Sequence, residues 1–526
     1  MKLQDLMRGL PFIQIHCETN PEVIDLQFDS RSVRLGSLFV AIVGVKADGH
    51  HFLVSAIRQG AIAVVVQKGS DFQNALSDDC GKKANIPVIV VENSREALDF
   101  LACQFYGNPS KNLLCVGVTG TNGKTSLTYL IEYLLNAAQC PTGVIGTIDH
   151  HLRIPANVEP LADRVGPEGA QDLMTWPADG TTPNPILLQA RLREFWNLGA
   201  KAAVLEVTSH ALDQKRADGV SFDVGVFTNL TQDHLDYHDS MENYFSTKVR
   251  FFTEILSGSQ KTNKMAIINV TDPWGQKLRE LIRTCDFKQL TFGRETGDFK
   301  YRIENMTATE TKFKLQTPQG QADVQSPLSG EHNVQNVVAA LAAVSAAGFD
   351  LRKAVHAMVK FPGIPGRLQL VPNSKGRPVF VDYAHTPDGL ESVLKTLRHV
   401  QSQGGHSGTK IWTVFGCGGD RDSGKRPLMA EIAERLSDQV IVTSDNPRME
   451  DPEKIIDQIV AGFSKVAHFN REVDRKKAIE MALKFSGPND LILIAGKGHE
   501  ETQQLGNQKI HFSDVEVAES FLKGEQ

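Results

Sequence analysis

The sequence predicts an α/β protein with mostly parallel sheets, and three observations carry that prediction. Short apolar runs rich in Val and Ile recur along the chain with helical patterns between them, which indicates parallel strands covered on both faces. The length of 526 residues corresponds to about three domains, since a typical domain has roughly 100–200 residues. Gly, Asn, Asp or His residues closely follow the runs, and parallel sheets bind ligands at the carboxyl ends of their strands.

The predicted strands fall into three groups. They cover residues 38–43, 61–66 and 88–91, then 113–118, 202–207, 224–227 and 266–270, and finally 379–381, 411–415, 440–443 and 491–495. Turn-rich stretches at 106–111 and 361–367 separate the groups, because clustered Gly and Pro interrupt regular structure. We therefore expect domains at 1–107, 108–360 and 361–526. In the middle domain, prolines and glycines at 154–185 predict a long loop or insertion.

The overall composition excludes several classes of protein. The 56 basic and 62 acidic residues give no polycationic surface for nucleic acid. The 7 cysteines form no C-x-x-C pair, which suits a reducing compartment. No apolar run approaches the ~20 residues of a membrane span, and the N-terminus lacks a signal-peptide pattern. We expect a cytoplasmic enzyme that acts as a monomer and has no nucleic-acid partner.

A glycine-containing loop follows the predicted strand 113–118. Residues 120–126 read G-T-N-G-K-T-S and precede a helical pattern at 127–135. Such a loop binds a nucleoside triphosphate, because backbone N–H groups and the helix N-terminus face the phosphates. Lys124 would reach the terminal phosphates and Thr125 would ligate magnesium. The motif predicts a central P-loop-type domain that uses ATP, although on the motif alone a plain strand-to-helix turn stays open.

Two other strand ends of the middle domain carry polar residues. E-V-T-S-H begins at Glu206, and T-N-L-T-Q-D-H-L-D-Y-H spans 228–238. A carboxylate and a histidine beside a phosphate loop fit divalent metals that bridge ATP to a second substrate. Taken singly, Glu206 also fits a surface carboxylate or helix cap, and His234 fits a core histidine. Both interpretations stay open at this point.

Six strings together resemble the Mur ligases, the ATP-dependent amide-bond-forming enzymes of peptidoglycan assembly. They are the three strings already quoted, with L-S-G-E-H-N-V-Q-N at 328–336, D-Y-A-H-T-P-D at 382–388 and G-C-G-G-D-R-D at 416–422. The resemblance runs from about Asp29 to near the C-terminus. It implies a smaller N-terminal domain for the UDP substrate, a central ATP-binding domain and a C-terminal, Rossmann-like domain for the amino acid.

Within the family, the N-terminal motifs resemble those of members that add the third amino acid to UDP-N-acetylmuramoyl-L-alanyl-D-glutamate. These motifs are D-S-R at 29–31, L-F-V-A at 38–41 and D-G-H-H-F at 48–52. D-N-P-R at 445–448 resembles the motif of members that select meso-diaminopimelate rather than lysine. Diaminopimelate has a second carboxylate, and the guanidinium of Arg448 can bind a carboxylate with two hydrogen bonds.

The resemblance also implies catalytic roles. Lys124 and Thr125 would hold the phosphates and one Mg²⁺, with Glu206 as another ligand of that ion, and His234 would ligate a second Mg²⁺. Lys248, in an expected helix at 244–252, aligns with the family's carbamylated lysine (N6-carboxylysine). Carbon dioxide converts an ammonium that repels magnesium into an anion that helps to order its water shell. Without the resemblance, Lys248 reads as a solvated helix lysine.

Three sets of binding residues follow from the resemblance. The ATP set is Gly120, Thr121, Asn122, Gly123, Lys124, Thr125, Ser126, Asn333, Asn336, Arg367, Asp382 and His385. The UDP-substrate set is Ser30, Thr181, Thr182, Ser209, Gln214 and Arg216. The amino-acid set is Arg421, Asp445, Asn446, Arg448, Gly496 and Glu500. The loop before Thr181 is longer than the family pattern leads us to expect.

The implied reaction has two steps. ATP would phosphorylate the D-glutamate carboxylate, and the amine of diaminopimelate would then attack the acyl phosphate. The sequence does not identify a base that deprotonates the amine. The alternatives are a lysine-adding ligase, another amide ligase such as a folylpolyglutamate synthase or cyanophycin-type enzyme, and a nucleotide-dependent switch without ligase activity.

Overall fold

The computed structural model describes residues 1–16, 19–44, 47–70, 72, 86–155, 158, 173–372, 377–403, 408–464 and 468–524. The chain forms two compact units. The first contains residues 1–293 and 339–351, and the second contains residues 294–338 and 352–526. The three-domain boundaries near 107 and 360 stay predictions.

The predicted α/β class is confirmed, because parallel strands dominate the large sheets. Each of the predicted strands is present, with ends shifted by a few residues at most. They are β3, β4, β5, β6, β10, β11, β12, β18, β19, β20 and β22, whose bounds are given below. In the described ranges, no helix is long and apolar enough to cross a membrane.

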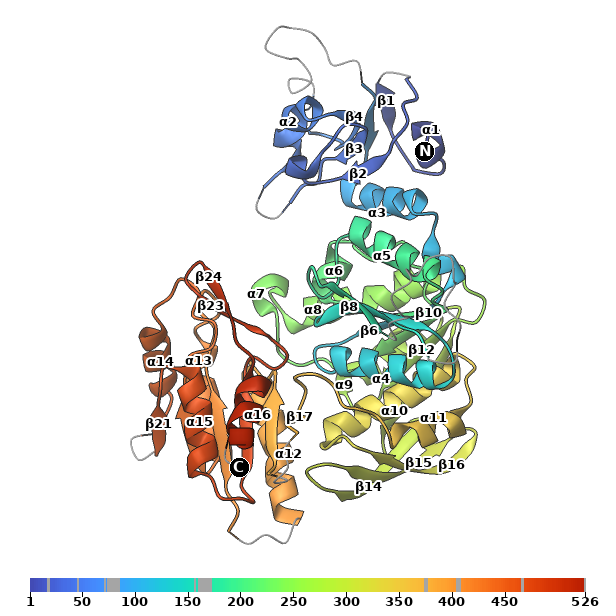
Figure 1. Cartoon of the computed structure of the whole chain (residues 1–526). Helices are drawn as coiled ribbons and strands as arrows, with labels where there is room; N and C mark the ends of the chain where they lie inside the picture. Colours follow the sequence, from blue (N-terminus) through green and yellow to red (C-terminus); the bar gives the residue numbers. More distant parts are fainter. Residues whose placement is uncertain are drawn as a thin grey trace. The chain divides into compact units, whose positions relative to one another are not determined.

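The first unit begins with a five-stranded sheet of order β1-β5-β4-β3-β2. All its neighbours are parallel except β1, which is antiparallel to β5. Helices α1 and α3 cover one face and α2 covers the other (Figure 1). The elements are α1 (Leu3–Leu6), β1 (Gln14–His16), β2 (Asp25–Gln27), η1 (Ser30–Ser32), β3 (Ser37–Val40), η2 (Gly49–Phe52), α2 (Leu53–Arg58), β4 (Ala61–Gln67), β5 (Val88–Val91) and α3 (Ser94–Phe105).

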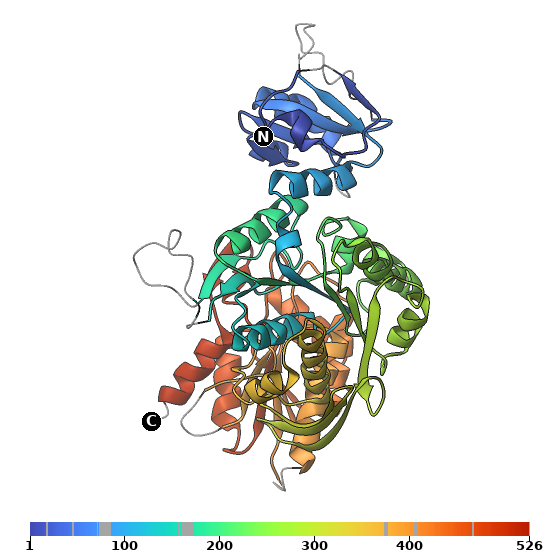
Figure 2. The ribbon, with the colours of Figure 1, turned by 90° about the vertical axis from the view of Figure 1, so that its right-hand side faces the viewer.

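The larger sheet of the first unit has the order β13-β12-β11-β6-β10-β7-β8-β9. Its strands are parallel from β13 to β7, while β8 and β9 are antiparallel. Helix α5 packs beside α3 in both views (Figure 1, Figure 2).

The elements of this sheet and its helices are η4 (Pro109–Asn112), β6 (Leu114–Thr119), α4 (Lys124–Ala137), β7 (Thr142–Ile145), β8 (Asp149–Arg153), β9 (Leu173–Pro177), α5 (Pro185–Asn197), β10 (Ala202–Glu206), α6 (Ser209–Asp213), β11 (Val224–Phe227), α7 (Leu235–His238), α8 (Met241–Arg250), η5 (Phe251–Leu256), β12 (Met265–Asn269), α9 (Pro273–Leu281) and β13 (Lys288–Arg294).

The prediction of a long loop or insertion at 154–185 is wrong in part. Residues Leu173–Pro177 form β9, which pairs with β8 along its whole length. Residues 156–157 and 159–172 lie outside the described residues. The Pro and Gly content hid this strand from the sequence, because an edge strand tolerates a proline where an inner strand does not.

The second unit contains three antiparallel strands and a mostly parallel sheet. The antiparallel strands have the order β14-β15-β16. The mostly parallel sheet has the order β17-β18-β22-β19-β20-β21, with only β17 antiparallel. Helices α12, α13 and α14 share a core on one face, and α15 and α16 share a core on the other (Figure 1).

The elements of this unit and the helices beside it are β14 (Phe299–Met306), β15 (Thr311–Thr317), β16 (Gly320–Ser326), α10 (Glu331–Ala346), α11 (Leu351–Met358), β17 (Gln369–Leu370), β18 (Val379–Asp382), α12 (Pro387–Gln403), β19 (Ile411–Phe415), α13 (Lys425–Leu436), β20 (Gln439–Val442), α14 (Pro452–Val460), β21 (Phe469–Arg471), α15 (Arg475–Phe485), β22 (Leu491–Ala495), β23 (Thr502–Leu505), β24 (Gln508–His511) and α16 (Asp514–Gly524).

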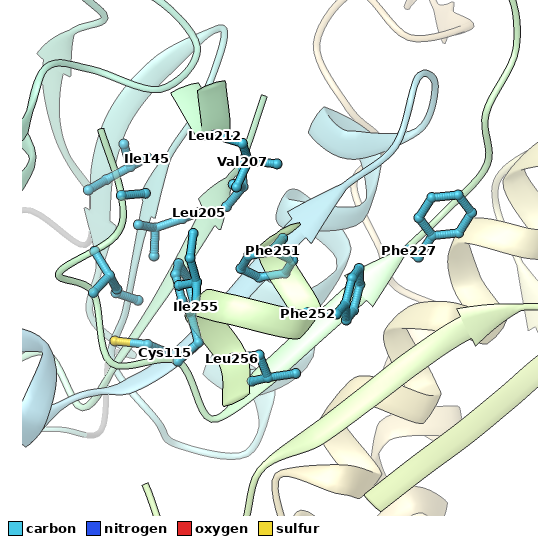
Figure 3. Packing of buried hydrophobic residues seen from close by; sticks show 14 of the residues in the cluster. Cys115, Ile145, Leu205, Val207, Leu212, Phe227, Phe251, Phe252, Ile255 and Leu256 are labelled. Atoms are coloured by element: carbon cyan, nitrogen blue, oxygen red, sulfur yellow. The ribbon is translucent and has the colours of Figure 1, made fainter. Parts of the chain in front are cut away.

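Two glycines allow close packing of the helical segment that carries Lys248 against the sheet. Gly117 of β6 and Gly225 of β11 are paired residues on neighbouring strands. A Cβ on Gly117 would lie 2.5 Å from the ring of Phe251, and one on Gly225 would lie 2.9 Å from it. Figure 3 shows Phe251 and Phe252 in the buried cluster with Leu205 and Ile255. The missing side chains therefore let η5, and α8 before it, approach the strand that leads into the phosphate loop.

Gly117→Ala should lower the free energy of unfolding by about 1–3 kcal/mol, because the added methyl group overpacks the contact with Phe251. Denaturant unfolding followed by circular dichroism measures the change.

Gly258→Ala is the matched control, since a Cβ there meets nothing within 4 Å. It should leave stability unchanged or raise it. Equal effects of the two substitutions on the free energy of unfolding would contradict the close packing of Phe251 against Gly117.

Candidate active site

The predicted phosphate loop, which starts at Gly120, joins the carboxyl end of β6 to the first residue of α4. Gly120 has φ +146° and Gly123 has φ +87°, which is backbone that glycine adopts without strain. A Cβ on Gly120 would lie 2.0 Å from the Thr228 hydroxyl. Glycine is therefore required at residue 120 for two independent reasons.

The segment after β11 braces this loop. The Thr228 hydroxyl donates to the Asn122 carbonyl at 2.7 Å. The backbone N–H of Asn122 donates to Asn229 Oδ1 at 2.9 Å, and that of Thr121 donates to the Asn229 carbonyl at 2.9 Å. The T-N string that the sequence placed at a strand end thus holds the phosphate loop in shape.

Two lysine side chains converge on one backbone carbonyl of this loop. Lys124 Nζ donates to the carbonyls of Gly120 at 3.0 Å and Thr121 at 2.7 Å. Lys248 Nζ donates to the same Gly120 carbonyl at 2.9 Å. The sequence placed these residues on separate elements, and the fold brings both amines to the start of the loop.

The amine of Lys248 is removed from water. Its side chain is 1% exposed, and Nζ lies 4.7 Å from the centroid of the Tyr244 ring. Burial holds the pKa of Lys248 well below its ordinary value, and the charge of Lys124 lowers it further. The reading of Lys248 as a solvated helix lysine is therefore wrong, because its helix presents it to the interior.

Glu206 lies buried at the carboxyl end of β10, beside β6. Thr147 donates to both carboxylate oxygens, from its N–H to Oε1 at 2.9 Å and from its hydroxyl to Oε2 at 3.1 Å. A Cβ on Gly146 would lie 2.5 Å from Oε1. The loop after β7 is thus shaped around this carboxylate, and the reading of Glu206 as a surface residue is wrong.

His234 stands at the N-terminal end of α7 with φ 54°. Its ring makes edge contacts with the rings of His210 at 4.9 Å and Tyr244 at 6.1 Å. Burial lowers the pKa of His234, and the positive charges of Lys124 and Lys248 lower it further. The histidine therefore lies within electrostatic range of both lysines, and at neutral pH its ring is a neutral ligand.

The oxygen donors at this end of the sheet suit magnesium. Glu206 supplies carboxylate oxygen and Thr125 supplies a hydroxyl. His234 adds a neutral imidazole nitrogen. Over the described ranges, no three His, Cys, Asp or Glu side chains gather closely enough to hold a metal unaided. A metal here would need oxygens from a bound substrate as well.

The candidate residues for the UDP substrate form a hydrogen-bonded network beside Glu206. The Thr181 hydroxyl lies 3.1 Å from that of Thr147, and the Thr182 hydroxyl donates to the Glu206 carbonyl at 2.7 Å. Arg216 donates to the Thr182 carbonyl at 3.0 Å and to Gln214 Oε1 at 2.6 Å. Four of the six predicted residues are therefore connected.

The other two stand apart from that network. Ser209, the first residue of α6, is 1% exposed, and in the described structure its hydroxyl has no hydrogen-bond partner. Ser30 lies in η1 of the five-stranded sheet domain. None of the hydrogen bonds described in the structure joins either residue to Thr182 or Arg216.

The second unit carries the remaining candidates for ATP. Asp382 ends β18, where burial raises its pKa to about 6 against the charge of Arg367. The guanidinium of Arg367 lies 5.0 Å from the centroid of the Tyr383 ring. His385 Nδ1 lies 2.8 Å from the Tyr383 carbonyl, and burial lowers the pKa of this histidine. These three residues thus surround the exit of one strand.

Asn333 and Asn336 lie on α10 and are buried. Asn333 Nδ2 donates to the Ser329 carbonyl at 2.7 Å. This bond ties the Asn333 side chain to the segment before α10, a local side-chain-to-backbone bond that asparagine commonly makes.

The six candidates for the amino acid gather at the carboxyl ends of β19, β20 and β22. Asn446 Nδ2 donates to Glu500 Oε2 at 2.7 Å, and Arg448 donates to the Gly419 carbonyl at 2.6 Å. A Cβ on Gly496 would lie 2.6 Å from an oxygen of Asp445. A Cβ on Gly418 would touch both arginines of the set, 2.9 Å from Arg448 and 3.9 Å from Arg421.

Arg448 has φ 51°, which is strained for any residue with a side chain. Its N–H donates to the Gln504 carbonyl at 3.2 Å, and its carbonyl accepts from the N–H of Gly506 at 2.7 Å. The hairpin of β23 and β24 thus holds the residue in this conformation. Strain that surrounding contacts maintain is typical of residues that bind ligands.

The sequence missed three residues that shape the site: Thr147, which orients Glu206, Thr228, which braces the loop, and Tyr244, which covers Lys248. Thr228 and Tyr244 lie inside strings that had been singled out for other residues. Thr147 lies just after β7, a strand of only four residues. The sequence of β7, β8 and β9 shows little periodicity, so no sequence signal marked Thr147.

Comparison with known proteins identifies the family. Three family models match the chain: the Mur ligase family, catalytic domain, at residues 23–106, the Mur ligase middle domain at 118–344, and the Mur ligase, glutamate ligase domain, at 366–498. Together they span all the candidate residues between Ser30 and Gly496.

Relatives match at nearly full length. A protein of Geobacillus kaustophilus named UDP-N-acetylmuramoyl-L-alanyl-D-glutamate--2,6-diaminopimelate ligase is 40% identical over 528 residues, covering 99% of each chain. A protein of Synechococcus elongatus with the same name is 40% identical and covers 100% of each.

A solved structure titled with that enzyme name is 32% identical, with a TM-score of 0.68 over 100% of this chain and 99% of that chain. A MurF structure from Acinetobacter baumannii shares the fold at 20% identity and a TM-score of 0.62, covering 94% and 95%. Identity of 40% along the whole chain and the same architecture lead to one conclusion. The protein belongs to the Mur ligase family.

Proposed function

We propose that this protein is the ATP-dependent ligase that adds meso-diaminopimelate to the D-glutamate of UDP-N-acetylmuramoyl-L-alanyl-D-glutamate in peptidoglycan biosynthesis. Its full-length relatives at 40% identity carry that enzyme's name. The observation that carries the proposal is the D-N-P-R loop, in which Arg448 is held in a strained conformation among the other predicted amino-acid-binding residues. We expect the enzyme to act in the cytoplasm, where ATP and nucleotide-linked precursors are available.

The phosphate loop would bind the triphosphate of ATP. Its backbone N–H groups and the start of α4 favour phosphate, and Lys124 would leave the Gly120 and Thr121 carbonyls to meet the terminal phosphate. The γ-phosphoryl group passes to the D-glutamate carboxylate, ADP leaves, and an acyl phosphate results. The positive charge of Lys124 offsets the negative charge that accumulates during the transfer.

Thr125, Glu206 and His234 would hold two Mg²⁺ ions together with substrate oxygens. Such ions neutralise phosphate charge when they are bound. Thr147 fixes the direction of the Glu206 carboxylate through both of its oxygens. The Thr181–Arg216 network, which borders Glu206, would bind the sugar peptide, and Ser30 would contact the uridine. Asn333, Asn336, Arg367, Asp382 and His385 complete the proposed ATP contacts.

Lys248 would act as a carbamate. A lysine whose pKa is well below its ordinary value supplies the uncharged amine that this reaction needs. The nitrogen lone pair attacks the carbon of CO₂, an N–C bond forms, and one proton leaves to water. The product is an anion in place of an uncharged amine, and it would offset the positive charge of Lys124 and the metals.

The incoming amino acid would bind at the carboxyl ends of β19, β20 and β22. Arg448 and Arg421 would take carboxylates, and Glu500 would take an ammonium group. The amine then attacks the acyl phosphate carbon, an amide bond forms, and phosphate leaves. Lysine has no second carboxylate, so a lysine-adding enzyme needs no guanidinium to bind one. The presence of Arg448 therefore favours diaminopimelate as the substrate.

Lys124→Met should reduce kcat by at least about 10²-fold, because it removes the charge that stabilises phosphoryl transfer. Phosphate release with acceptor, diaminopimelate and ATP present measures this rate, and mass spectrometry identifies the tripeptide product.

Lys261→Met is its control, since Lys261 also donates to backbone carbonyls but stands near the other end of β6. It should retain kcat within about threefold, as substitutions away from a site usually do. Comparable losses in both variants would sink the assignment of Lys124.

Arg448→Ala should raise KM for meso-diaminopimelate by about 10²-fold, because a charged, two-pronged hydrogen bond to the second carboxylate is lost. KM for ATP should stay within about twofold. Steady-state assays with diaminopimelate, with lysine and without amino acid decide the substrate. Wild-type preference for lysine would replace the proposal with the lysine-adding alternative.

Lys248→Arg should abolish the carbamate, because a guanidinium does not react with CO₂ at neutral pH. Nuclear magnetic resonance with isotopically labelled bicarbonate should show a carbamate carbonyl signal in the wild type and none in the variant. Removing dissolved CO₂ should reduce wild-type activity reversibly. A wild-type spectrum without the signal would remove the modification from the proposal.

A further inference from the structure

Lys497 is a buried cation in the A-G-K-G-H-E loop that follows β22. Its side chain is 0% exposed. Its three N–H donors meet three acceptors: Thr502 O at 2.6 Å, Glu500 Oε2 at 2.9 Å and Asn446 Oδ1 at 3.3 Å. The proposed reaction has no role for this charge, although two of its three partners belong to the proposed amino-acid site.

The ammonium group helps to fix the orientation of the Asn446 side chain. An ammonium donates and never accepts, so the amide of Asn446 must present its oxygen to Lys497. That oxygen also accepts from the backbone N–H of Gln504 at 2.9 Å. The amide nitrogen is then directed at Glu500 Oε2, to which it donates at 2.7 Å. Lys497 and the Gln504 N–H thus hold the amide oxygen together, and loss of Lys497 removes one of these two donors.

Lys497 also determines which oxygen of Glu500 remains for a ligand. Both Lys497 and Asn446 donate to Oε2. For Oε1, no donor is found among the residues that the structure describes, and the Glu500 side chain is 30% exposed. The turn that brings the two residues together is closed by a bond from the Glu500 N–H to the Lys497 carbonyl at 2.9 Å.

Arg475, another buried cation near this loop, is already paired. Arg475 forms a salt bridge with Asp514 at 2.7 Å, and both side chains are 0% exposed. Arg475 also donates to the carbonyls of Ser444 and Ala495, at the exits of β20 and β22. Lys497 is therefore the buried cation that pairs with Glu500. Arg475 instead holds the backbone at the ends of β20 and β22.

We infer that Lys497 is a positioning residue for the incoming amino acid, which it never touches: it orients Glu500 and Asn446 so that Glu500 Oε1 meets a substrate ammonium group. The inference rests on the proposed function, since it names a further determinant of the same site. Lys497 acts on the amine-binding part of the site, whereas Arg448 acts on the carboxylate-binding part.

Lys497→Met keeps the unbranched stem and removes the charge and all three donors. It should raise KM for meso-diaminopimelate by at least about tenfold, while KM for ATP and for the UDP acceptor stays within about threefold. Lys497→Gln, which keeps N–H donors without charge, is the variant to assay if the methionine variant unfolds at the assay temperature, with the same result expected.

A double-mutant cycle with Glu500→Gln separates positioning from general damage. If Lys497 acts through Glu500, its substitution adds less than about threefold to the loss in kcat/KM that Glu500→Gln already causes. Losses that multiply would overturn the inference, and so would an unchanged KM for diaminopimelate in the folded Lys497 variant.

Arg377→Met is the matched control for loss of a buried cation. Arg377 is 7% exposed and donates to the Leu483 and Ser486 carbonyls. It should lower the melting temperature yet leave KM for diaminopimelate within about threefold. An equal rise in KM in this control would assign the Lys497 effect to lost stability.

The proposed function and this inference fail in different ways. A wild-type protein that forms no amide product with diaminopimelate refutes the proposed function. A wild-type protein that forms the product, beside a folded Lys497→Met variant with unaltered KM, refutes the inference alone.

Discussion

The first unit depends on one shared acceptor, the carbonyl of Gly120, which accepts from both Lys124 and Lys248. Two ammonium groups so close together repel each other, and burial adds a desolvation cost that falls mainly on Lys248. The arrangement is sustainable because Lys248 can give up its proton. The same condition would supply the uncharged amine that the proposed carbamylation of Lys248 needs.

Several features of the sheet serve this arrangement. The paired glycines of β6 and β11 let Phe251 approach the strands, which brings α8 and Lys248 beneath the loop. Thr228 and Asn229 brace the loop from the neighbouring strand. Thr147 turns Glu206 toward the same edge. The carboxyl ends of β6, β10 and β11 thus present a glycine-containing loop, a carboxylate and a histidine at one edge, which is where parallel sheets generally bind their ligands.

The second unit uses the same topological principle with different chemistry. Its strand exits carry two exposed or half-buried arginines and a carboxylate, which suits a zwitterion with an additional carboxylate. Two devices hold these groups: the hairpin of β23 and β24 keeps Arg448 at positive φ, and buried Lys497 orients Asn446 and Glu500. Family membership shows an amide-bond-forming ligase, and these side chains carry the argument for which amino acid it takes.

The sequence by itself determined the α/β class, the positions of eleven strands and the glycine turn after β6, because continuous Val and Ile runs and a glycine turn are local signals. Its motifs also identified the family. Tertiary structure alone decided the rest. The proline content around β9 argued against a strand there, and no local sequence pattern marked Thr147 as a site residue. The burial of Lys248 and Lys497 depends on which partners surround them, since a lysine in a helix or glycine turn looks solvated until distant residues such as Gly120 or Asn446 close around it.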